Sequence, residues 1–346
     1  MGLMPGRGET AIDLMNRLLD RGYVQASGAV LQAITRNSTT GLMARRFEEL
    51  EREAARLAAE GARLTLDNAV VRAFMADFED TMRANQALLN SAAGAVQQTG
   101  IDAAGPIARQ MALPGFTDEM LRAMGIAWNV PNPEAVARLV NYASSDAWAG
   151  LVGKYGDDAV AVVKAVAVRG ALEGWGPVRT AREMRRMVEG IPPNTANTLM
   201  RTLQLTSLRD AQTVHRVANA DILEYQIRIA ALDDRTCVAC IALHGMVMGL
   251  GERVDDHHNG RCTSITKIRG WAAPDVQSGP DWFRQLPEAK QREHMSAAAW
   301  EAWNAGKVRL DDFAQRTVDD VFGGMIQEAS LKGILGSGAR EFYGVG

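Results

Sequence analysis

Cysteine is nearly missing from this sequence, and its three cysteines all lie between positions 237 and 262. Three cysteines cannot build the disulfide framework of a small secreted domain. Aromatic residues are also scarce, at 6% of the chain, so its cores must pack mainly with Ala, Val, Leu and Met. The sixteen methionines favour adaptable contacts between helices. These shortages point to a helical protein with one unusual, cysteine-bearing segment.

Long apolar runs are missing as well. The longest, Ala159–Val168, is interrupted by Lys164 and is too short to span a bilayer. The N-terminus shows no apolar core of a signal peptide behind Arg7. We therefore expect no membrane partner. We also expect the protein to be made and used in the cytoplasm, or to be assembled there into a larger structure. The net charge of −3 argues against a protein that coats DNA, although it leaves room for local basic surfaces.

Residues 9–100 have the pattern of a long helical hairpin. Asp67 or Asn68 is placed to cap its second helix, which carries Val71, Phe74 and Phe78 on one face. The first helix has an apolar stripe with alternating spacings of four and three, which is typical of a coiled-coil-like core face. The stripe consists of Met43, Phe47, Leu50, Ala54, Leu57, Gly61 and Leu64.

Glycines and prolines then predict a series of shorter helices. The segment 157–172 is apolar almost all round, which predicts a buried helix. Another helix is expected from Arg179 to Val188, and Gly190–Pro193 separates it from a longer one. The earlier helix breakers are Gly100, Gly105–Pro106, Pro114–Gly115 and Pro131–Pro133.

A small mixed module is predicted around the cysteines. Residues 224–229 alternate with a period of two, which indicates a strand that leads into the cysteine segment. After residue 275 the pattern returns to helix, and the glycine-rich end is expected to be a loose arm. The sequence thus predicts a mainly α protein in four parts: a helical hairpin at 1–100, a helical domain with a basic face at 101–220, a small α+β Cys/His module at 221–275, and a helical segment with a Gly-rich tail at 276–346.

The predicted basic face lies in the second of these parts. Within residues 164–216, nine Lys or Arg stand against four Asp or Glu. Such a face fits phosphate or an acidic partner. The sequence favours a solvated helix face over such a binding face, because no aromatic residues interleave to stack on bases. The four arginines that crowd one short helix are Arg179, Arg182, Arg185 and Arg186.

The cysteine segment collects the ligands that tetrahedral Zn²⁺ prefers, thiolate sulfur and imidazole nitrogen. Cys237 and Cys240 form a Cys-x-x-Cys pair, and His257 and Cys262 follow about twenty residues later. These four residues predict a structural zinc site, with His258 as an alternative ligand. Two other readings stay open: a redox pair or disulfide between the first two cysteines, or reduced thiols packed as small hydrophobic groups.

Four separate signals between roughly residues 165 and 320 resemble the phage head-morphogenesis family, the Mu gpF-like minor head proteins. One departure concerns the second half of the Cys/His segment, where the family often has His-Pro-x-Cys-Arg-Cys. Here His258 stands at the proline position and Gly260 at the first of those cysteines, which leaves Cys262 as the only thiol and His257 as the better matched imidazole. In order, the signals are Leu199–Thr202; Leu232–Cys240 with Leu243–Gly245; His257–Thr263; and Asp281–Phe283 through Leu286–Pro287, with Gln291 and Gly306–Asp312.

The resemblance implies a minor head (capsid) protein of a tailed bacteriophage, a structural protein rather than an enzyme. It implies incorporation with the portal during procapsid assembly in the host cytoplasm, and a role in DNA packaging or ejection. The expected location is the virion head at the portal vertex. The expected partners are the portal protein, the major capsid or scaffolding protein, and packaged double-stranded DNA.

Two other functions compete with this one. Asp256–Asn259 beside a cysteine pair is similar to metal-dependent nucleases in which a histidine activates water. Such sites need a further Asn and His on a following helix and usually a second cysteine pair. After Cys262 this sequence has one histidine, His294, one asparagine, Asn304, and no cysteine. The other alternative is a DNA-binding module that uses Arg179–Arg186. The sequence has neither a Gly-x-Ser-x-Gly elbow nor a phosphate-binding Gly-x-x-x-x-Gly-Lys loop.

Overall fold

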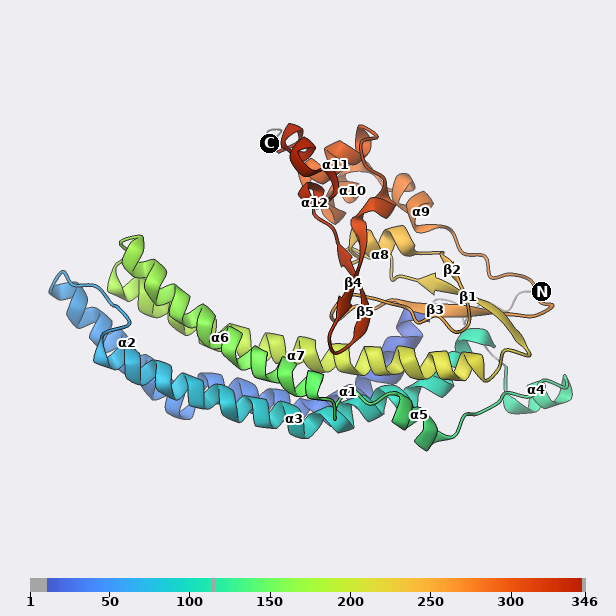
Figure 1. The fold of residues 1–346 in the computed structure, drawn as a ribbon, viewed down its shortest axis with the longest axis horizontal. Helices are drawn as coiled ribbons and strands as arrows, with labels where there is room; N and C mark the ends of the chain where they lie inside the picture. The colour runs from blue at the N-terminus through green and yellow to red at the C-terminus, as the bar shows by residue number, and fades with distance from the viewer. Residues whose placement is uncertain (1–10, 114–115, 344–346) are drawn as a thin grey trace. The chain divides into compact units, whose positions relative to one another are not determined.

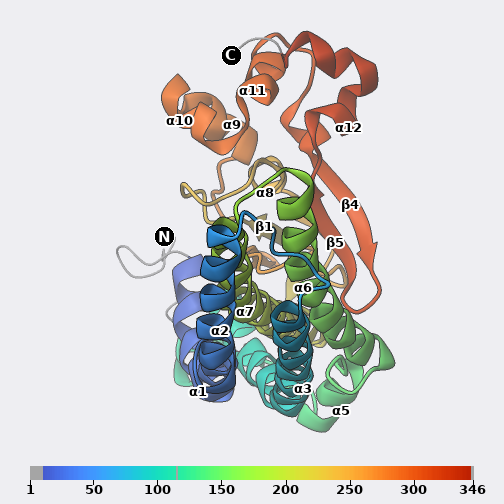
Figure 2. The same cartoon turned by 90° about the vertical axis from the view of Figure 1, so that its left-hand side faces the viewer.

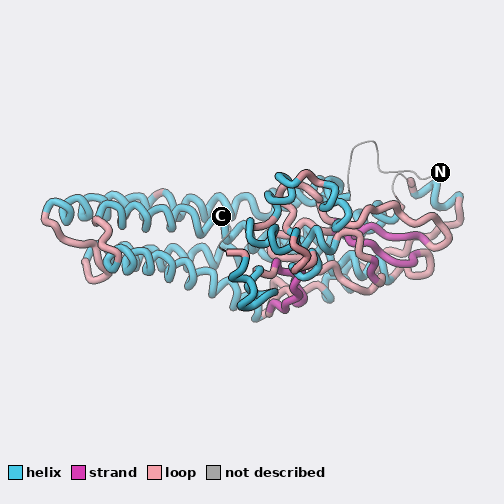
Figure 3. Tube along the Cα trace, turned by 90° about the horizontal axis from the view of Figure 1, so that it is seen from above, coloured by secondary structure: helices cyan, strands magenta, loops and turns pink. Residues whose placement is uncertain are grey.

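A computed structural model describes residues 11–113 and 116–343 (Figure 1). The described residues are mainly helical, with one three-stranded and one two-stranded sheet, and this confirms the prediction of a mainly α protein (Figure 3). They form two compact units. The helical unit comprises Gly22–Gln97 and Tyr142–Leu203. The mixed unit comprises the described parts of Met1–Arg21, Gln98–Asn141 and Gln204–Gly346. The predicted four-part division stays a prediction.

The core of the helical unit lies where apolar stripes meet. The predicted stripe is confirmed, because its members other than Gly61 are buried; that glycine lies in the following turn with a φ of +68°. Phe47 packs against Phe74 with ring centroids 5.8 Å apart. The described helices that contribute are α1 (Ala11–Thr39), α2 (Gly41–Ala59), α3 (Ala69–Ala112), α6 (Asp146–Leu172) and α7 (Pro177–Val217), of which α1, α3 and α7 also contribute to the mixed unit.

Asn68 caps α3 as its position in the sequence predicts. Its Oδ1 accepts hydrogen bonds from the backbone N–H groups of Val70 and Val71, at 2.8 and 3.3 Å. These N–H groups have no partner within the helix, so a side-chain oxygen that accepts from them fixes the place where the helix begins.

The predicted interruptions inside α3 and α7 are wrong. Helix α3 continues through Gly100, Gly105 and Pro106, and α7 continues through Pro192 and Pro193. Gly100 allows α3 to touch the backbone of α7, because a Cβ there would lie 2.3 Å from the carbonyl oxygen of Gln204. The carbonyl of Pro192 accepts a hydrogen bond from the Tyr155 hydroxyl at 3.1 Å. Tertiary packing therefore stabilises helices through residues that usually end them. The predicted break at Pro114–Gly115 lies outside the described residues.

The prediction that 157–172 is buried all round is also wrong. This segment forms the second half of α6, and one face of it is exposed, with Val168 at 44% and Leu172 at 81% of full exposure. The apolar composition therefore reflects an uncovered face as well as a buried one. Among the described residues, no helix combines the length and apolar character needed to cross a membrane.

The mixed unit contains the predicted strand as the centre of an antiparallel sheet. Strand β1 (Leu223–Ile229) lies between β2 (Val247–Met248) and β3 (Thr263–Ile268), with Ile227 opposite both Val247 and Ile265. A short helix, α8 (Val238–Leu243), follows β1 and opens the cysteine segment. Two further short helices of this unit are α4 (Asp118–Ala123) and α5 (Pro133–Leu139).

The C-terminal part of the mixed unit differs from its purely helical prediction. The helix expected from Leu310 is a single 3-10 turn, η1 (Leu310–Phe313), and a β-hairpin follows it. The expected loose arm is wrong for the described residues, because Leu331, Ala339 and Phe342 are buried against the helices around them (Figure 2). The remaining elements are α9 (Gly279–Gln285), α10 (Glu288–His294), α11 (Ala297–Asn304), β4 (Ala314–Asp319), β5 (Gly323–Glu328), α12 (Leu331–Leu335) and η2 (Gly336–Glu341).

Candidate metal centre

Cys237 and Cys240 stand at the start of α8. Cys237 is the N-cap residue, and its sulfur accepts a hydrogen bond from the backbone N–H of Cys240 at 3.4 Å. The turn before them is held by Asp233, which accepts two hydrogen bonds of 2.7 Å from the guanidinium of Arg261. This paired geometry ties the first cysteine turn to the second half of the site.

His257 and Cys262 lie in the loop between β2 and β3. The loop turns tightly at Asn259, whose φ is +56°, and passes Gly260 against the side chain of Asp256. A Cβ at position 260 would lie only 2.2 Å from the carboxyl carbon of Asp256. The absence of a cysteine at this position therefore has a steric reason, because any side chain would displace the buried carboxylate.

The donor atoms of the two segments converge in the folded chain. Cys237, Cys240 and His257 place their ligand atoms within 4.8 Å of one another. Cys262 belongs to a second such group, with Cys240 and Asp256. Cys240 is common to both groups, so the two groups overlap at its sulfur and form one cluster of five residues, although no single group contains both His257 and Cys262.

The alternative ligand His258 is not part of either group. Its Nε2 lies 3.7 Å from a carboxylate oxygen of Asp319, and its ring meets the edge of Phe322 at 6.0 Å between centroids. His258 thus faces the β4–β5 hairpin rather than the sulfurs.

The hydrogen bonds of His257 prepare its other ring nitrogen for a metal. Nδ1 lies 2.9 Å from the carbonyl oxygen of His258, and a carbonyl can only accept. Nδ1 therefore carries the proton, and Nε2 keeps its lone pair for the cluster. A backbone carbonyl that fixes the tautomer in this way is common behind metal-bound histidines.

The cluster also changes the protonation of its members. A hydrogen bond from Cys240 lowers the pKa of Cys237 to about 4. Burial acts in the opposite direction and raises this pKa, whereas His257 lowers it further. The hydrogen bond to Cys237 raises the pKa of His257 to about 9. Hydrogen bonds to Cys237 and Cys262, together with burial, raise the pKa of Cys240. Without a metal, the site thus holds a thiolate paired with an imidazolium beside a protonated thiol.

Asp256 is a fully buried carboxylate at the centre of the loop. Its oxygens accept from Arg209 at 2.9 Å and from the backbone N–H groups of Cys262 and His257 at 2.8 and 3.0 Å. Burial alone would raise the pKa of Asp256, but the guanidinium groups of Arg209 and Arg228 outweigh it and lower this pKa to about 2. A charged Asp256 therefore organises the backbone that carries two of the ligands.

Arg209 fastens this loop to α7 within the mixed unit. Its Nε donates to the carbonyl of Cys262 at 3.1 Å, and its Nη2 donates to the carbonyl of Gly260 at 2.7 Å. Both carbonyls belong to the turn that presents Cys262. The position of the third sulfur is thus set by a residue from a helix that ends before β1.

Arg228 on β1 supplies the observation that tests whether a metal fits. Its Nη1 donates to the carbonyl of Asp255, whereas Nε and Nη2 are buried without a hydrogen-bond acceptor. Nη2 lies 3.6 Å from Asp256 Oδ1. A buried donor left unsatisfied costs about 1–3 kcal/mol. Burial lowers the pKa of Arg228, but its interactions with Cys262, Asp256 and Cys240 outweigh burial and raise this pKa. A guanidinium in this place favours thiolates beside it, and a bound metal keeps cysteine sulfurs ionised, so the donor set of three sulfurs and one imidazole fits Zn²⁺.

Sequence reasoning missed the supporting role of three residues. Arg209 and Arg228 were not considered, and Asp256 was considered only as a nuclease residue. One signal in the sequence could have indicated Arg209 and Arg228: each is an arginine within an apolar run, in α7 and in β1 respectively. His244, four residues after Cys240, is buried, and its Nδ1 accepts from the backbone N–H of Ala230 at 2.9 Å.

The four arginines of the predicted basic face lie on α7 in the helical unit. Arg185 pairs with Glu189 and Glu51 at 2.8 and 2.9 Å, and Arg186 pairs with Glu183 at 2.9 Å. Arg179 lies over the ring of Trp175, 4.0 Å from its centroid, while Arg182 is exposed. Carboxylates therefore offset part of the positive charge that the sequence predicts for this face.

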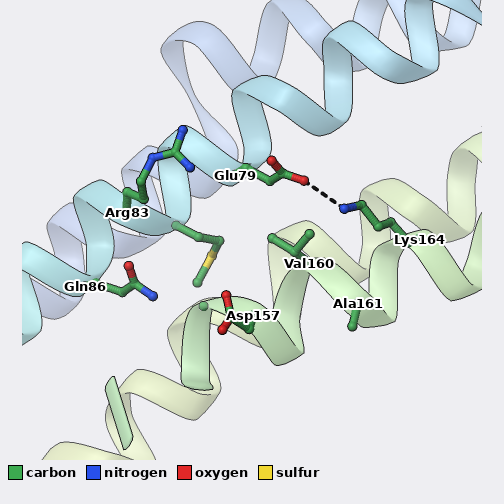
Figure 4. Close-up of a pocket in the computed structure, with 9 residues that line it drawn as sticks. Glu79, Arg83, Gln86, Asp157, Val160, Ala161 and Lys164 are labelled. Atoms are coloured by element: carbon green, nitrogen blue, oxygen red, sulfur yellow. Dashed lines mark hydrogen bonds and ion pairs between the residues drawn. The ribbon is translucent and has the colours of Figure 1, made fainter. Parts of the chain in front are cut away.

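The helical unit also has a cleft of about 400 Å³ between α3 and α6 (Figure 4). Its rim carries an ion pair of 2.8 Å between Glu79 and Lys164. The remaining lining residues include Arg83, Gln86 and Asp157, and none of the lining residues is Ser, Thr, Cys or His.

No family model, curated protein or solved structure matches this chain. Its likeness to minor head proteins therefore remains a prediction from the four sequence signals.

Proposed function

We propose that this chain is a minor head protein of a tailed bacteriophage, associated with the portal, whose small α+β module is held together by a structural Zn²⁺. The ligands are Cys237, Cys240, His257 and Cys262. The observation that supports the proposal is that these four side chains, from two separate segments, fall into two groups of possible metal ligands that share Cys240. The cluster lies within the same residues whose signals resemble the head-morphogenesis family.

The surroundings of the cluster favour a structural ion. Cys240 and Cys262 are buried, and four protein ligands leave no position for a substrate. The buried apolar group directly around the sulfurs is small, because besides the two cysteines it contains Ala230, Met248 and Val254. A structural zinc contributes about 10 kcal/mol or more of apparent binding free energy, which suits a module of this size.

The proposed role is assembly with the portal protein and the major capsid or scaffolding protein, with the packaged double-stranded DNA as a further contact. The helical unit presents long helices to a partner. In its basic face, Arg182 is exposed, and Arg179 is exposed and stacks on the ring of Trp175. The proposed location is the virion head at the portal vertex.

Co-sedimentation with the portal ring of the same phage tests this role. We expect the zinc-loaded chain to sediment with assembled portal rings and the Cys237→Ser/Cys262→Ser variant to stay in the supernatant, because the module loses its fixed shape without its ligands. His258→Ala, which removes an imidazole outside the cluster, serves as the matched control and is expected to sediment normally. Failure of the zinc-loaded wild type to sediment would contradict the proposal.

A metal-dependent nuclease is the second function considered, and the geometry disfavours it. A nuclease in which Asp256 takes part needs this carboxylate to reach water. The Asp256 side chain is 0% exposed, and its oxygens are engaged by Arg209 and by two backbone N–H groups. Its place in the chain is thus that of a structural anchor.

Plasmid nicking distinguishes the two functions. We expect no nicking of supercoiled DNA by the wild-type chain in the presence of Zn²⁺ or Mg²⁺, and no difference between wild type and His257→Ala. The check is gel electrophoresis of supercoiled plasmid. Wild-type nicking that disappears in a folded His257→Ala variant would support the nuclease instead.

A further inference from the structure

Arg209 and Arg228 approach the same buried carboxylate, that of Asp256, but they are engaged differently. Arg209 Nη2 donates to Oδ2 at 2.9 Å, and this arginine also donates to the backbone carbonyls of Gly260 and Cys262. Arg228 Nη2 lies 3.6 Å from Oδ1, beyond hydrogen-bond distance, and its Nε and Nη2 are buried without an acceptor. The guanidinium of Arg228 thus has two buried donors to spare, which is unfavourable unless a further acceptor is supplied.

The sulfur of Cys240 shares this carboxylate oxygen. Its Sγ lies 3.3 Å from Asp256 Oδ1 and, as a thiol, donates its proton to that oxygen. A cysteine that binds a metal has lost this proton. The ion offsets part of the charge on the sulfur, but the sulfur and the carboxylate oxygen then lie side by side without a proton between them. Two negative groups so close to each other disfavour the ionised form of the thiol.

Arg228 is a cation that lies beside both groups. Its guanidinium interacts with the carboxylate of Asp256 and with the sulfur of Cys240. Its place is fixed by β1, the central strand of the three-stranded sheet, and by the carbonyl of Asp255, which accepts from Nη1. The charge and the two spare donors of Arg228 are therefore held where a metal-bound sulfur of Cys240 needs a positive neighbour.

We propose that Arg228 is a positioning residue of the metal centre, which allows Cys240 to bind the ion as a thiolate by offsetting the negative charge that this sulfur and Asp256 bring together. The inference rests on the proposed zinc site and adds to it a residue that itself binds no metal. Without the guanidinium of Arg228, Cys240 keeps the proton that it donates to Asp256, and the ion loses one of its three sulfurs.

Cobalt substitution tests the proposal because it counts the thiolates. Co²⁺ takes the place of Zn²⁺ in tetrahedral sites, and its sulfur-to-metal absorption in the near ultraviolet grows with each thiolate bound. We expect the Co²⁺-loaded full chain to show three thiolates. Arg228→Met, similar in length but uncharged, is expected to show about two thirds of this absorption and a dissociation constant for Co²⁺ about 10–100-fold higher. Arg228→Lys retains the positive charge and is expected to restore the full absorption.

Arg216→Met is the matched control. Arg216 is also buried in the mixed unit, and its Nε also has no acceptor. Its other donors face the hydroxyl groups of Thr213 and Ser264 rather than a sulfur. This variant therefore loses a buried guanidinium without changing the surroundings of Cys240. It is expected to keep the absorption and the Co²⁺ affinity of the wild type.

The possible results separate this inference from the zinc site itself. Three thiolates in both the wild type and Arg228→Met would overturn the inference and leave the zinc site intact. Equal losses in Arg228→Met and Arg216→Met would also overturn it, because the cause would then be a general loss of folding. If Arg228→Met does not fold, a folded Arg228→Lys variant with two thiolates would overturn it. A wild-type chain that binds no Co²⁺ would contradict the proposed zinc site, and this inference with it.

Discussion

Cys240→Ser is expected to abolish zinc binding and to lower the free energy of unfolding of the mixed unit by an amount on the order of 5 kcal/mol. Cys240 is the residue common to both donor groups, so its loss separates Cys237 and His257 from Cys262. The serine oxygen is a poor replacement for a thiolate ligand, and the binding free energy of a structural zinc is folding free energy. Metal analysis together with calorimetric unfolding measures both effects.

The control for this prediction is His258→Ala, since His258 lies outside the cluster and faces Asp319. It is expected to retain one zinc per chain and the wild-type unfolding curve. A strong chelator is expected to bring the wild type to the stability of Cys240→Ser and to leave Cys240→Ser unchanged. If chelation removed the metal without moving the wild-type transition, the ion would not be a structural staple.

Asp256→Ala is expected to destabilise the mixed unit by about 3–5 kcal/mol, because it leaves the charges of Arg209 and Arg228 buried without their partner. The carboxylate also holds the backbone N–H groups of His257 and Cys262, so we expect zinc affinity to fall as well. Chemical denaturation with and without Zn²⁺ separates the two effects, since the charge penalty persists in the absence of metal.

The same substitution at an exposed aspartate provides the comparison. Asp234 lies in the turn before the first cysteine, is 76% exposed, and approaches only Lys290 at 3.6 Å. Asp234→Ala is expected to leave both stability and zinc affinity unchanged within measurement error. An Asp256→Ala variant as stable as Asp234→Ala would show that the buried ion pairs do not hold the loop.

Local patterns predicted the parts of the fold that depend on local chemistry. The stripe from Met43 to Leu64, the Asn68 cap and strand β1 each follow from the spacing or hydrogen-bonding capacity of adjacent residues. The length of α3 and α7 could not be predicted in this way. Gly100 and Pro192 are unfavourable in an isolated helix, and they are accepted because distant residues, Gln204 and Tyr155, pack against them.

The β4–β5 hairpin was missed although its turn left a cue. Gly323, with a φ of +71°, stands next to Gly324 at the start of β5, and the side chain of Asp319 accepts from the backbone N–H groups of Val321 and Phe322. An aspartate followed by paired glycines is a recognised hairpin turn signal. The strands beside it are mostly polar, so they lack the alternation that made β1 visible.

The candidate site also has one part that could be predicted from the sequence and one part that could not. The proposed ligands could be singled out because soft donors are rare in this chain and gather in one segment. Their support was not predictable, because Arg209 and Asp256 are separated by 47 positions and only the folded chain brings them together. Gly260 shows the same limit: its small size is required by the Asp256 carboxylate, a contact that the sequence does not reveal.

X-ray absorption spectroscopy at the zinc edge, on the purified full chain with its metal content measured, tests the central claim most directly. The account predicts one zinc per chain with three sulfur neighbours at about 2.3 Å and one nitrogen neighbour at about 2.0 Å. His257→Ala should remove the nitrogen neighbour, while His258→Ala should leave the spectrum unchanged. A chain purified without zinc that takes none up, or a zinc surrounded mainly by oxygen, would contradict it.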